Sequence, residues 1–166
     1  MAIRILTKAD AAAFRALRLR ALQEHPEAFT SSVEEDALKP LSATEQRIAG
    51  DSGNVFWGAF ADGEIRGMIG LTRDPRAKAL HKGDIVAMYV APELGRRGLA
   101  RALLQASIDY ARNEARLEQL VLSVTRTNEA AAKLYKSVGF VTFGLEPRAI
   151  RVDGVYFDKE HMVLFL

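Results

Sequence analysis

Residues 84–101 combine glycines and arginines in an order that suits a phosphorylated ligand. They read D-I-V-A-M-Y-V-A-P-E-L-G-R-R-G-L-A-R: a β-rich run over 85–90, a loop with Gly95 and Gly98, and an apolar-periodic helix from about Leu99. A strand that leads into a helix through a tight glycine loop directs several main-chain N–H groups at one point, where the helix dipole favours negative charge. Three arginines add positive charge: Arg96, Arg97 and Arg101. The segment therefore predicts a diphosphate site and, with it, a phosphorylated carrier.

A second segment, residues 127–140, places an amide and a phenol on one predicted helix. It reads T-N-E-A-A-A-K-L-Y-K-S-V-G-F, and we expect the helix over 128–138. Asn128 suits the N-cap and Gly139 the glycine that ends the helix. On residue type alone, Tyr135 is a packed aromatic beside Leu134 and Phe140.

The elements that position these segments follow from periodicity and from turn dipeptides such as Asp62-Gly63. We expect strands over 2–6, 55–61, 64–73, 85–90, 120–124, 140–145 and 155–166, the last two joined across Asp153-Gly154. Helices are expected from a Thr7 cap to about Glu24, from a Ser42 cap to Gly50, and over 99–116 and 128–138. Residues 27–41 have the weakest periodicity and are read as a loop with room for one helical turn. Run 120–124 is apolar at nearly every position, which is typical of a central strand.

Composition indicates one soluble domain spanning residues 1–166. The chain is 49% hydrophobic and 27% charged, as is ordinary for a globular protein. Its pI is near 9.0, but 23 basic residues against 21 acidic ones leave a net charge of only +2. This balance argues against a nucleic-acid or membrane partner. The N-terminus resembles neither a signal peptide nor a membrane span, so we expect a cytoplasmic protein.

Cysteine and histidine content limits the chemistry further. With no cysteine, disulfides, thiolate zinc sites and a cysteine nucleophile are excluded. The three histidines (His25, His81 and His161) are far apart, and no pair has the helical spacing of metal ligands. We therefore expect no metal.

The element order and the two segments together resemble the GCN5-related N-acetyltransferase (GNAT) superfamily over essentially the whole chain. Residues 88–101 resemble its acetyl-CoA pyrophosphate motif, R/Q-x-x-G-x-G/A, and residues 127–140 are similar to its N-x-x-A-x-x-L-Y-x-x-x-G-F segment. Gly95 departs from the first motif, because it stands where the family usually has Arg or Gln. The resemblance implies an α/β fold (α+β by some schemes): one mixed sheet of about seven strands, about four flanking helices and a splayed central strand pair.

The resemblance also implies acetyl-CoA as co-substrate and an N-acetyltransferase activity. The pantetheine arm would lie between the separated strands and pair with main-chain groups near Met88 and Val90. The amide of Val90 would donate to the thioester oxygen. The full set of residues that the resemblance assigns to acetyl-CoA is Met88, Tyr89, Val90, Gly95, Arg96, Arg97, Gly98, Leu99, Ala100, Arg101 and Asn128.

The general acid follows from the resemblance, whereas the general base stays open. Tyr135 matches the tyrosine that protonates the leaving thiolate, and an unperturbed pKa of about 10 keeps a phenol protonated at neutral pH. Many relatives carry a carboxylate at the position of Val86. Asp84, Glu34, Glu35 or a water chain are the alternatives here. Without that carboxylate, an α-amine with a pKa of about 8 is a better acceptor than a lysine side chain with one of about 10.4.

The acceptor side is expected to be built from the first helices, residues 27–41 and the C-terminal hairpin. Aromatic residues there could line an apolar pocket: Phe29, Trp57, Tyr156 and Phe157. The acidic cluster Glu34, Glu35 and Asp36 could attract a cationic amine. The acceptor is expected to be a primary amine of a small molecule or of a peptide N-terminus, and residues 163–166 are apolar enough for an interior strand or a homodimer interface.

Two other classes of function are weighed against the enzyme. The first is a catalytically weak acyl-CoA-binding regulatory module, which the missing carboxylate at Val86 supports. The second is RNA binding, because G-R-R-G matches the backbone-clamping loop of KH domains. That loop joins two helices, whereas a strand and Pro92 precede this one, so the RNA interpretation is disfavoured.

Overall fold

Seven strands form one mixed sheet in the computed structural model, which describes residues 1–50, 52–95 and 98–166. The strands are β1 (Ala2–Ile5), β2 (Val55–Ala61), β3 (Glu64–Thr72), β4 (Lys82–Val90), β5 (Gln119–Thr125), β6 (Val141–Val152) and β7 (Val155–Phe165). Their spatial order is β1-β2-β3-β4-β5-β7-β6. Neighbours are antiparallel except β4 and β5, which run parallel. The expected α/β class, the mixed sheet and the central place of β5 are confirmed.

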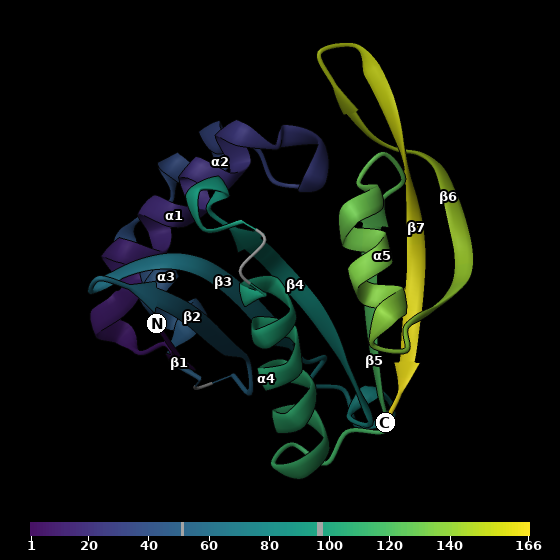
Figure 1. Cartoon of the computed structure of the whole chain (residues 1–166), viewed down its shortest axis with the longest axis horizontal. Coiled ribbons are helices and arrows are strands. Elements are labelled where there is room, and N and C mark those ends of the chain that lie inside the picture. The colour runs from purple at the N-terminus through teal and green to yellow at the C-terminus, as the bar shows by residue number, and fades with distance from the viewer. Residues whose placement is uncertain (51, 96–97) are drawn as a thin grey trace.

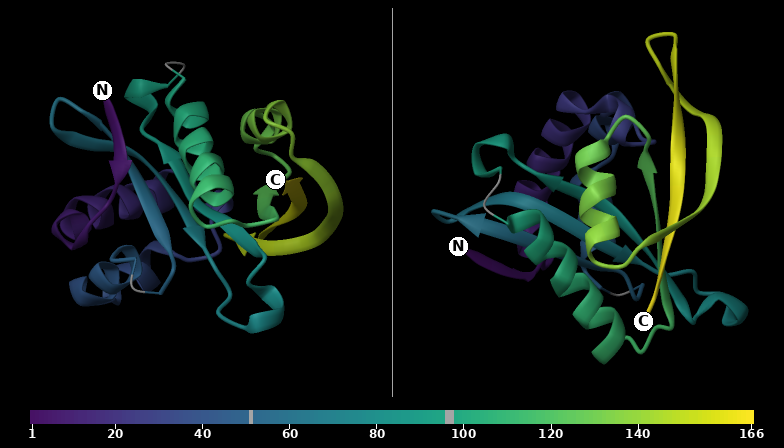
Figure 2. Two further views of the ribbon diagram at one scale, coloured as in Figure 1. Left: turned by 90° about the horizontal axis from the view of Figure 1, so that it is seen from below. Right: turned by 45° about the vertical axis from the view of Figure 1, so that its right-hand side comes forward.

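Helices cover both faces of this sheet (Figures 1 and 2). The α-helices of the described residues are α1 (Ala11–Glu24), α2 (Val33–Leu38), α3 (Leu41–Ile48), α4 (Leu99–Asn113) and α5 (Glu129–Ser137). Short 3₁₀ turns are η1 (Lys8–Asp10), η2 (Pro26–Ala28), η3 (Ala77–Ala79) and η4 (Pro92–Leu94). Within this part of the chain no helix is both long and apolar enough to cross a bilayer.

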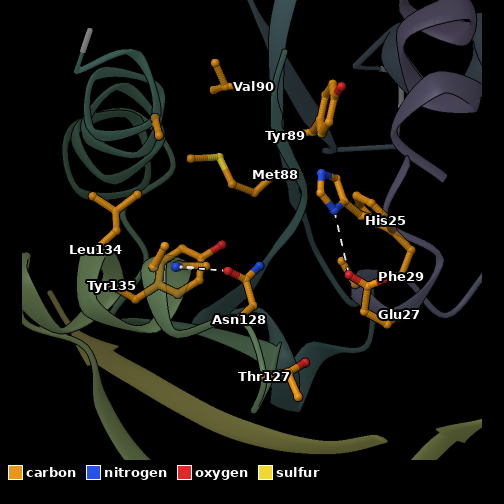
Figure 3. Close-up of a pocket in the computed structure, with 14 residues that line it drawn as sticks. His25, Glu27, Phe29, Met88, Tyr89, Val90, Thr127, Asn128, Leu134 and Tyr135 are labelled. Atoms are coloured by element: carbon orange, nitrogen blue, oxygen red, sulfur yellow. Dashed lines mark hydrogen bonds and ion pairs between the residues drawn. The ribbon is translucent and has the colours of Figure 1, made fainter. Parts of the chain in front are cut away.

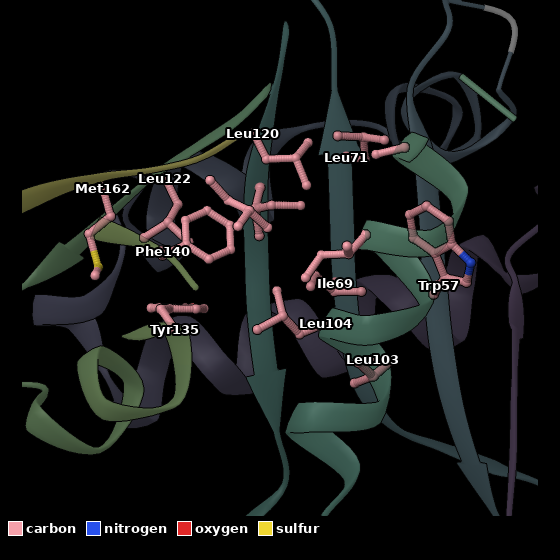
Figure 4. Packing of buried hydrophobic residues seen from close by; sticks show 14 of the residues in the cluster. Trp57, Ile69, Leu71, Leu103, Leu104, Leu120, Leu122, Tyr135, Phe140 and Met162 are labelled. Carbon is pink, nitrogen blue, oxygen red and sulfur yellow. The ribbon is translucent and has the colours of Figure 1, made fainter. Parts of the chain in front are cut away.

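Two hydrophobic cores, one on each face, hold the helices to the sheet. On one face, Leu103 and Leu104 of α4 pack with Ile69 and Leu120, and the same cluster includes Tyr135 of α5 (Figure 4). On the other face, α1 packs on the sheet through residues such as Phe14, with α3 beside it. Burying a large apolar side chain is worth about 1.5–3 kcal/mol, so these clusters fix the frame around the site.

The sheet opens between β4 and β5. The two strands pair only over Lys82–Asp84 and Gln119–Val121, at their first residues. Beyond this point they separate, with α4 and α5 on either side of the gap (Figure 1). The splayed central pair expected from the family resemblance is therefore present.

A bulge in β4 accounts for the divergence. The register with β3 shifts between Met68 and Gly70, and Ala87 has a positive φ of 56°. An extra residue in one strand bends that strand and increases its twist, which turns the end of β4 away from β5. The ring of Phe56 lies where a Cβ on Gly70 would be, so this stretch of β3 needs glycine.

The structure corrects three details of the expected secondary structure. Residues 27–41, read as a loop, include α2, in which Ser32 and Glu35 form a capping box. The helix expected from Ser42 begins at Leu41 with Pro40 as its N-cap, and the amide of Ala43 already donates to the carbonyl of Pro40. The strand expected over 140–145 runs on to Val152, because two register shifts carry the pairing past Gly144 and Pro147.

Candidate active site

The gap between β4 and β5 is a cavity with two connected parts. The larger part, about 430 Å³, lies between β4, α5 and the turn that follows α1. The smaller part, about 110 Å³, continues between the separated ends of β4 and β5. Both are lined by Phe29, Met88, Asn128 and Tyr135. Six of the expected site residues therefore meet there: Met88, Tyr89, Val90, Ala100, Asn128 and Tyr135.

Main-chain groups of β4 face this gap. The amide of Ala91 donates to the carbonyl of Arg66 at 2.8 Å, and Val90 is paired with Gly67. Because hydrogen-bonded and non-hydrogen-bonded pairs alternate in an antiparallel ladder, the amide and carbonyl of Val90 point away from β3 and into the gap. Met88, two residues earlier, shares that edge. The geometry suits pairing with an extended ligand that lies in the gap.

The first turn of α4 has main-chain N–H groups that the helix itself does not use. Gly98 is the N-cap residue and has a φ of 74°, a conformation in which L side chains are strained. Open space surrounds the position of a Cβ at Gly98, so the backbone conformation is what favours glycine there. Leu99 is buried in the core and Ala100 lines the cavity. The first amides of α4 are therefore available to an anion.

The remaining residues expected at this turn have different placements. The amide of Gly95 already donates to the carbonyl of Pro92 at 2.9 Å. Arg96 and Arg97 lie outside the described residues. Arg101 reaches from α4 to α5, where its Nη2 donates to Oγ of Ser137 at 2.6 Å. Arg101 therefore links the two helices that flank the gap.

An ion-pair cluster fixes η4, the turn directly before this loop. Glu93 accepts two hydrogen bonds from Arg20, at 2.8 and 2.9 Å, and one from Arg66 at 3.0 Å. The Arg20 guanidinium is the main cause that lowers the pKa of Glu93 to about 2. Glu24, also bonded to Arg20, accepts a hydrogen bond from the Tyr89 hydroxyl. Burial is the main cause that raises the pKa of Tyr89, and this hydrogen bond raises it further.

Asn128 and Tyr135 form the α5 wall of the cavity. Oδ1 of Asn128 accepts from the amide of Ala131 at 3.2 Å, which confirms the N-cap and leaves the side-chain NH₂ free of that bond. The Tyr135 ring packs edge-on against Phe140 with centroids 6.0 Å apart. No described residue hydrogen-bonds to its hydroxyl, which Figure 3 shows directed into the cavity on the Asn128 side. Burial raises the pKa of Tyr135 to about 12, so the phenol is protonated at neutral pH.

His25 and Glu27, which sequence reasoning missed as site residues, line the opposite wall. Nδ1 of His25 lies 3.7 Å from Oε1 of Glu27, and the second ring nitrogen of His25 faces the cavity (Figure 3). The main chain of Glu27 is anchored because its carbonyl accepts from Oγ1 of Thr125 at 2.7 Å. The sequence signal was the H-P-E triplet directly after α1, interpreted only as the end of a helix.

The carboxylates weighed as general bases lie elsewhere. Asp84 is paired with Thr72 and Val121 at the closed end of the gap, and none of the cavity linings includes it. Its pKa is raised, chiefly by burial. Glu35 caps α2 by accepting from the amide of Ser32 at 2.9 Å.

A separate groove of about 440 Å³ lies where the acceptor side was expected. It runs between residues 29–34 and the end of the β6–β7 hairpin at 150–153, and Glu34 and Phe29 line it. The end of this hairpin projects beyond β5 in Figures 1 and 2. Asp36 does not face the groove, because it is buried against Arg18 and Lys39.

Of the four aromatic residues considered for an acceptor pocket, only Phe29 lines either the cavity or the groove. Trp57 packs edge-on against Tyr110 in the core, with centroids 5.4 Å apart. Tyr156 stacks under Arg148 and Arg151 on the hairpin. Across the described residues, no cluster of three His, Cys, Asp or Glu side chains has the geometry to hold a metal ion.

The opened sheet, the free amides of a helix N-terminus and a buried phenol at the gap define a protein of the acetyltransferase class. A model of the acetyltransferase (GNAT) family matches residues 18–140, and the chain belongs to that family. It is 33% identical over 115 residues to the N-alpha-acetyltransferase RimI of Mycobacterium tuberculosis, an alignment that covers 69% of each protein.

Two further comparisons bear on the ligands of relatives. The chain is 28% identical over 99 residues to a spermidine N(1)-acetyltransferase of Vibrio cholerae, covering 60% of this chain and 57% of that protein. A proposed acetyltransferase of Salmonella typhimurium, yncA, solved with its cofactor acetyl-CoA, superposes with a TM-score of 0.83 at 25% identity, covering 100% of this chain and 94% of the other. The named acceptors of these relatives differ, so the names alone do not fix an acceptor for this chain.

Proposed function

We propose that the protein transfers the acetyl group of acetyl-CoA to a primary amine of a small molecule or a peptide N-terminus, by direct attack in a ternary complex. The observation that carries the proposal is the open β4–β5 gap, with the Val90 main chain on one wall and the Tyr135 hydroxyl on the other. Its support is the family match and the similarity to yncA, whose structure contains acetyl-CoA.

The residues present fit the pantetheine arm and the pyrophosphate of acetyl-CoA. The edge of β4 at Met88 and Val90 offers main-chain partners to the amides of a pantetheine arm. The first turn of α4, from Gly98 to Arg101, offers amides to a pyrophosphate. Asn128 has a side-chain NH₂ that its capping bond does not use. These assignments use only residues of the expected set and form one path from the turn to the gap.

The transfer needs one new bond and two proton movements. The amine nitrogen attacks the thioester carbon, a C–N bond forms, and the C–S bond breaks. The amide of Val90 donates to the carbonyl oxygen as negative charge develops; such a donor is worth about 10²–10³ in rate in other enzymes. Tyr135 gives its proton to the leaving sulfur, and the proton of the amine passes to a base on the opposite wall.

His25 is the base that the geometry favours. Histidine is the side chain that most often serves as a general base in enzymes. One ring nitrogen faces the cavity, and Glu27 lies beside the other at 3.7 Å. Its carboxylate can stabilise the imidazolium that forms when His25 takes the proton. The attacking amine must still be neutral, so an α-amine remains a better acceptor than a lysine side chain.

An acceptor screen tests the proposed function directly. The protein is incubated with acetyl-CoA and a panel of primary amines, thiol release is followed, and products are checked by mass spectrometry for one added acetyl group. We expect release to depend on an amine and to match product formation. Acetyl-CoA binding with no transfer across a broad panel would instead favour the regulatory binding module.

A further inference from the structure

A smaller pocket, separate from the transfer cavity, lies between α1, α2 and α3. These helices lie together, away from α4 and α5 (Figure 1). The pocket has a volume of about 180 Å³, and Phe14 and Ala43 are among its apolar lining residues. This volume is about ten times the least that can hold one water molecule, so an ion of several atoms can enter. The proposed transfer uses none of the residues that line it.

The polar lining of this pocket is strongly basic. Four basic side chains line it: Arg15, Arg18, Lys39 and Arg47. Asp36 is the one carboxylate among the described residues that surround it. Because like charges repel most strongly where water is partly excluded, an anion bound among these cations would be stabilised by all of them.

Asp36 is already engaged, whereas part of the Arg18 guanidinium is not. Asp36 accepts from Nε of Arg18 at 3.1 Å and from Nζ of Lys39 at 2.6 Å, one bond to each carboxylate oxygen. Arg18 is only 7% exposed. Its two terminal nitrogens have no hydrogen bond to any described residue, yet they are not among the fully buried unpaired atoms. They are therefore open to the pocket that Arg18 lines.

Arg47 of α3 is a second guanidinium with donors to spare. It makes no hydrogen bond or ion pair with a described residue, and its guanidinium lies over the Phe56 ring at 5.2 Å from the centroid. Burial, and then the charge of Arg18, lower the pKa of Arg47, while the charge of Asp36 raises it by less. Arg18 and Arg47 are thus close enough to repel each other, and a shared anion would relieve that repulsion.

We propose that this pocket binds a phosphate group between the guanidinium groups of Arg18 and Arg47. A guanidinium presents paired N–H donors that match a phosphate at two points. Lys39, whose side chain is 54% exposed, adds positive charge where the pocket meets solvent. A phosphate dianion matches the excess of positive charge better than a monocarboxylate does.

The size of the pocket limits the ligand to inorganic phosphate or the phosphate group of a small phosphomonoester. Its volume is below the range of about 300–1,000 Å³ that is usual for pockets that enclose whole small-molecule ligands. A bound phosphate would contact α1 and α3 together, so it should also stabilise the folded protein.

Titration calorimetry tests this proposal with inorganic phosphate, glycerol phosphate and acetate as probes, at about pH 8 and constant ionic strength. A phosphomonoester with a second pKa of about 6 is a dianion there. Coenzyme A is present throughout, so that phosphate does not bind at the first turn of α4. The proteins compared are the unaltered chain, Arg47→Met, which keeps the Arg18–Asp36 pair, and the control Arg112→Met, at an exposed arginine near the end of α4.

We expect Arg47→Met to weaken phosphate binding by about tenfold or more, because charge-assisted hydrogen bonds are lost. Phosphate should raise the melting temperature of the unaltered protein and of Arg112→Met, and that of Arg47→Met much less. Acetate should bind at least about tenfold more weakly than phosphate. Equal affinities for the two phosphate probes would support recognition of the phosphate group alone, and tighter binding of the ester would support a phosphorylated metabolite.

Phosphate affinity that Arg47→Met leaves unchanged, no phosphate binding to the unaltered protein, or acetate bound as tightly as phosphate would each overturn the proposal. Arg47→Gln replaces Arg47→Met if melting curves show that the latter is unstable. The result does not depend on acetyl transfer: if the protein bound no coenzyme A, the proposed function would fail, whereas a loss of phosphate binding in Arg47→Met would still support this site.

Discussion

Tyr135 is both a buried core residue and the proposed general acid. Its ring contributes to the core against Phe140, while its hydroxyl stays free of any bond from the described residues. Tyr135→Phe keeps the ring and removes the proton. We expect kcat to fall by about 10²-fold or more, with the affinity for acetyl-CoA and the melting temperature little changed.

Steady-state kinetics and calorimetric binding of acetyl-CoA check this prediction together. Tyr156→Phe, on the exposed hairpin, is the matched control and should keep full activity. Unchanged turnover in Tyr135→Phe would remove the acid role.

The raised pKa of Tyr135 predicts the alkaline side of the pH profile. Tyr135 must be protonated to act, and because its pKa is raised to about 12, rising pH should not deprotonate it below about pH 11. A general base must be deprotonated, so kcat should rise with pH through the titration of the base and then stay level to about pH 10. A descending limb that begins near pH 8 would conflict with Tyr135 as the acid.

His25 is the expected source of the ascending limb. His25→Gln should lower kcat/KM by about 10²-fold at neutral pH and weaken the acidic limb, because the proton acceptor is gone. Glu27→Gln should have a smaller effect in the same direction. His81→Gln, at an exposed histidine between η3 and β4, is the control and should leave the profile unchanged. If His25→Gln leaves the pH profile unchanged, His25 is not the general base, and a water chain is the better candidate.

At the scale of elements, the turn before α4 is expected to serve ligand binding more than stability. Gly98 and Gly63 both have positive φ, 74° and 81°, and neither has a neighbour within 4 Å of a built Cβ. Valine at either position should cost a similar amount of stability, about 1–2 kcal/mol for the strained backbone. Only Gly98→Val should also weaken acetyl-CoA binding, because Gly63 lies in the remote β2–β3 turn.

Melting curves and calorimetry on the two valine variants separate strain from binding. Equal affinities for acetyl-CoA in Gly98→Val and Gly63→Val would show that the turn is not the pyrophosphate site.

Elements with strong local signals could be predicted from the sequence. Strand β2 was expected over its observed bounds and α4 and α5 close to theirs, because glycines, caps and apolar periodicity agree there, whereas β4 was expected from residue 85 and begins at Lys82. Helix α2 was expected only as an alternative, one helical turn within a loop, because six residues give too little periodicity to place a helix. The length of β6 was missed because Gly144 and Pro147 interrupt its pattern, while bulges restore the pairing.

Site residues could be predicted from the sequence only where they lie close together in one segment. The β4–α4 segment and the start of α5 supplied Met88, Val90, Gly98, Asn128 and Tyr135 as expected site residues. His25 and Glu27 reach the cavity from a distant part of the chain, through the packing of η2 on β5. Sequence spacing carries no information about such contacts.

At the scale of the whole molecule, the sheet divides into two halves that share only a short parallel pairing. Strands β1–β4 with α1 and α4 form one half, and β5–β7 with α5 form the other. The three paired residues at the start of β4 and β5 and the bond from Arg101 to Ser137 join the halves on either end of the gap. A ligand in the gap would therefore contact both halves at once.

A crystal structure with acetyl-CoA tests this account most directly. We expect the pantetheine arm between β4 and β5, the amide of Val90 on the thioester oxygen, the pyrophosphate on the first turn of α4, and the sulfur within reach of the Tyr135 hydroxyl. Coenzyme A bound at any other surface, with the gap between the strands left empty, would contradict the central claim.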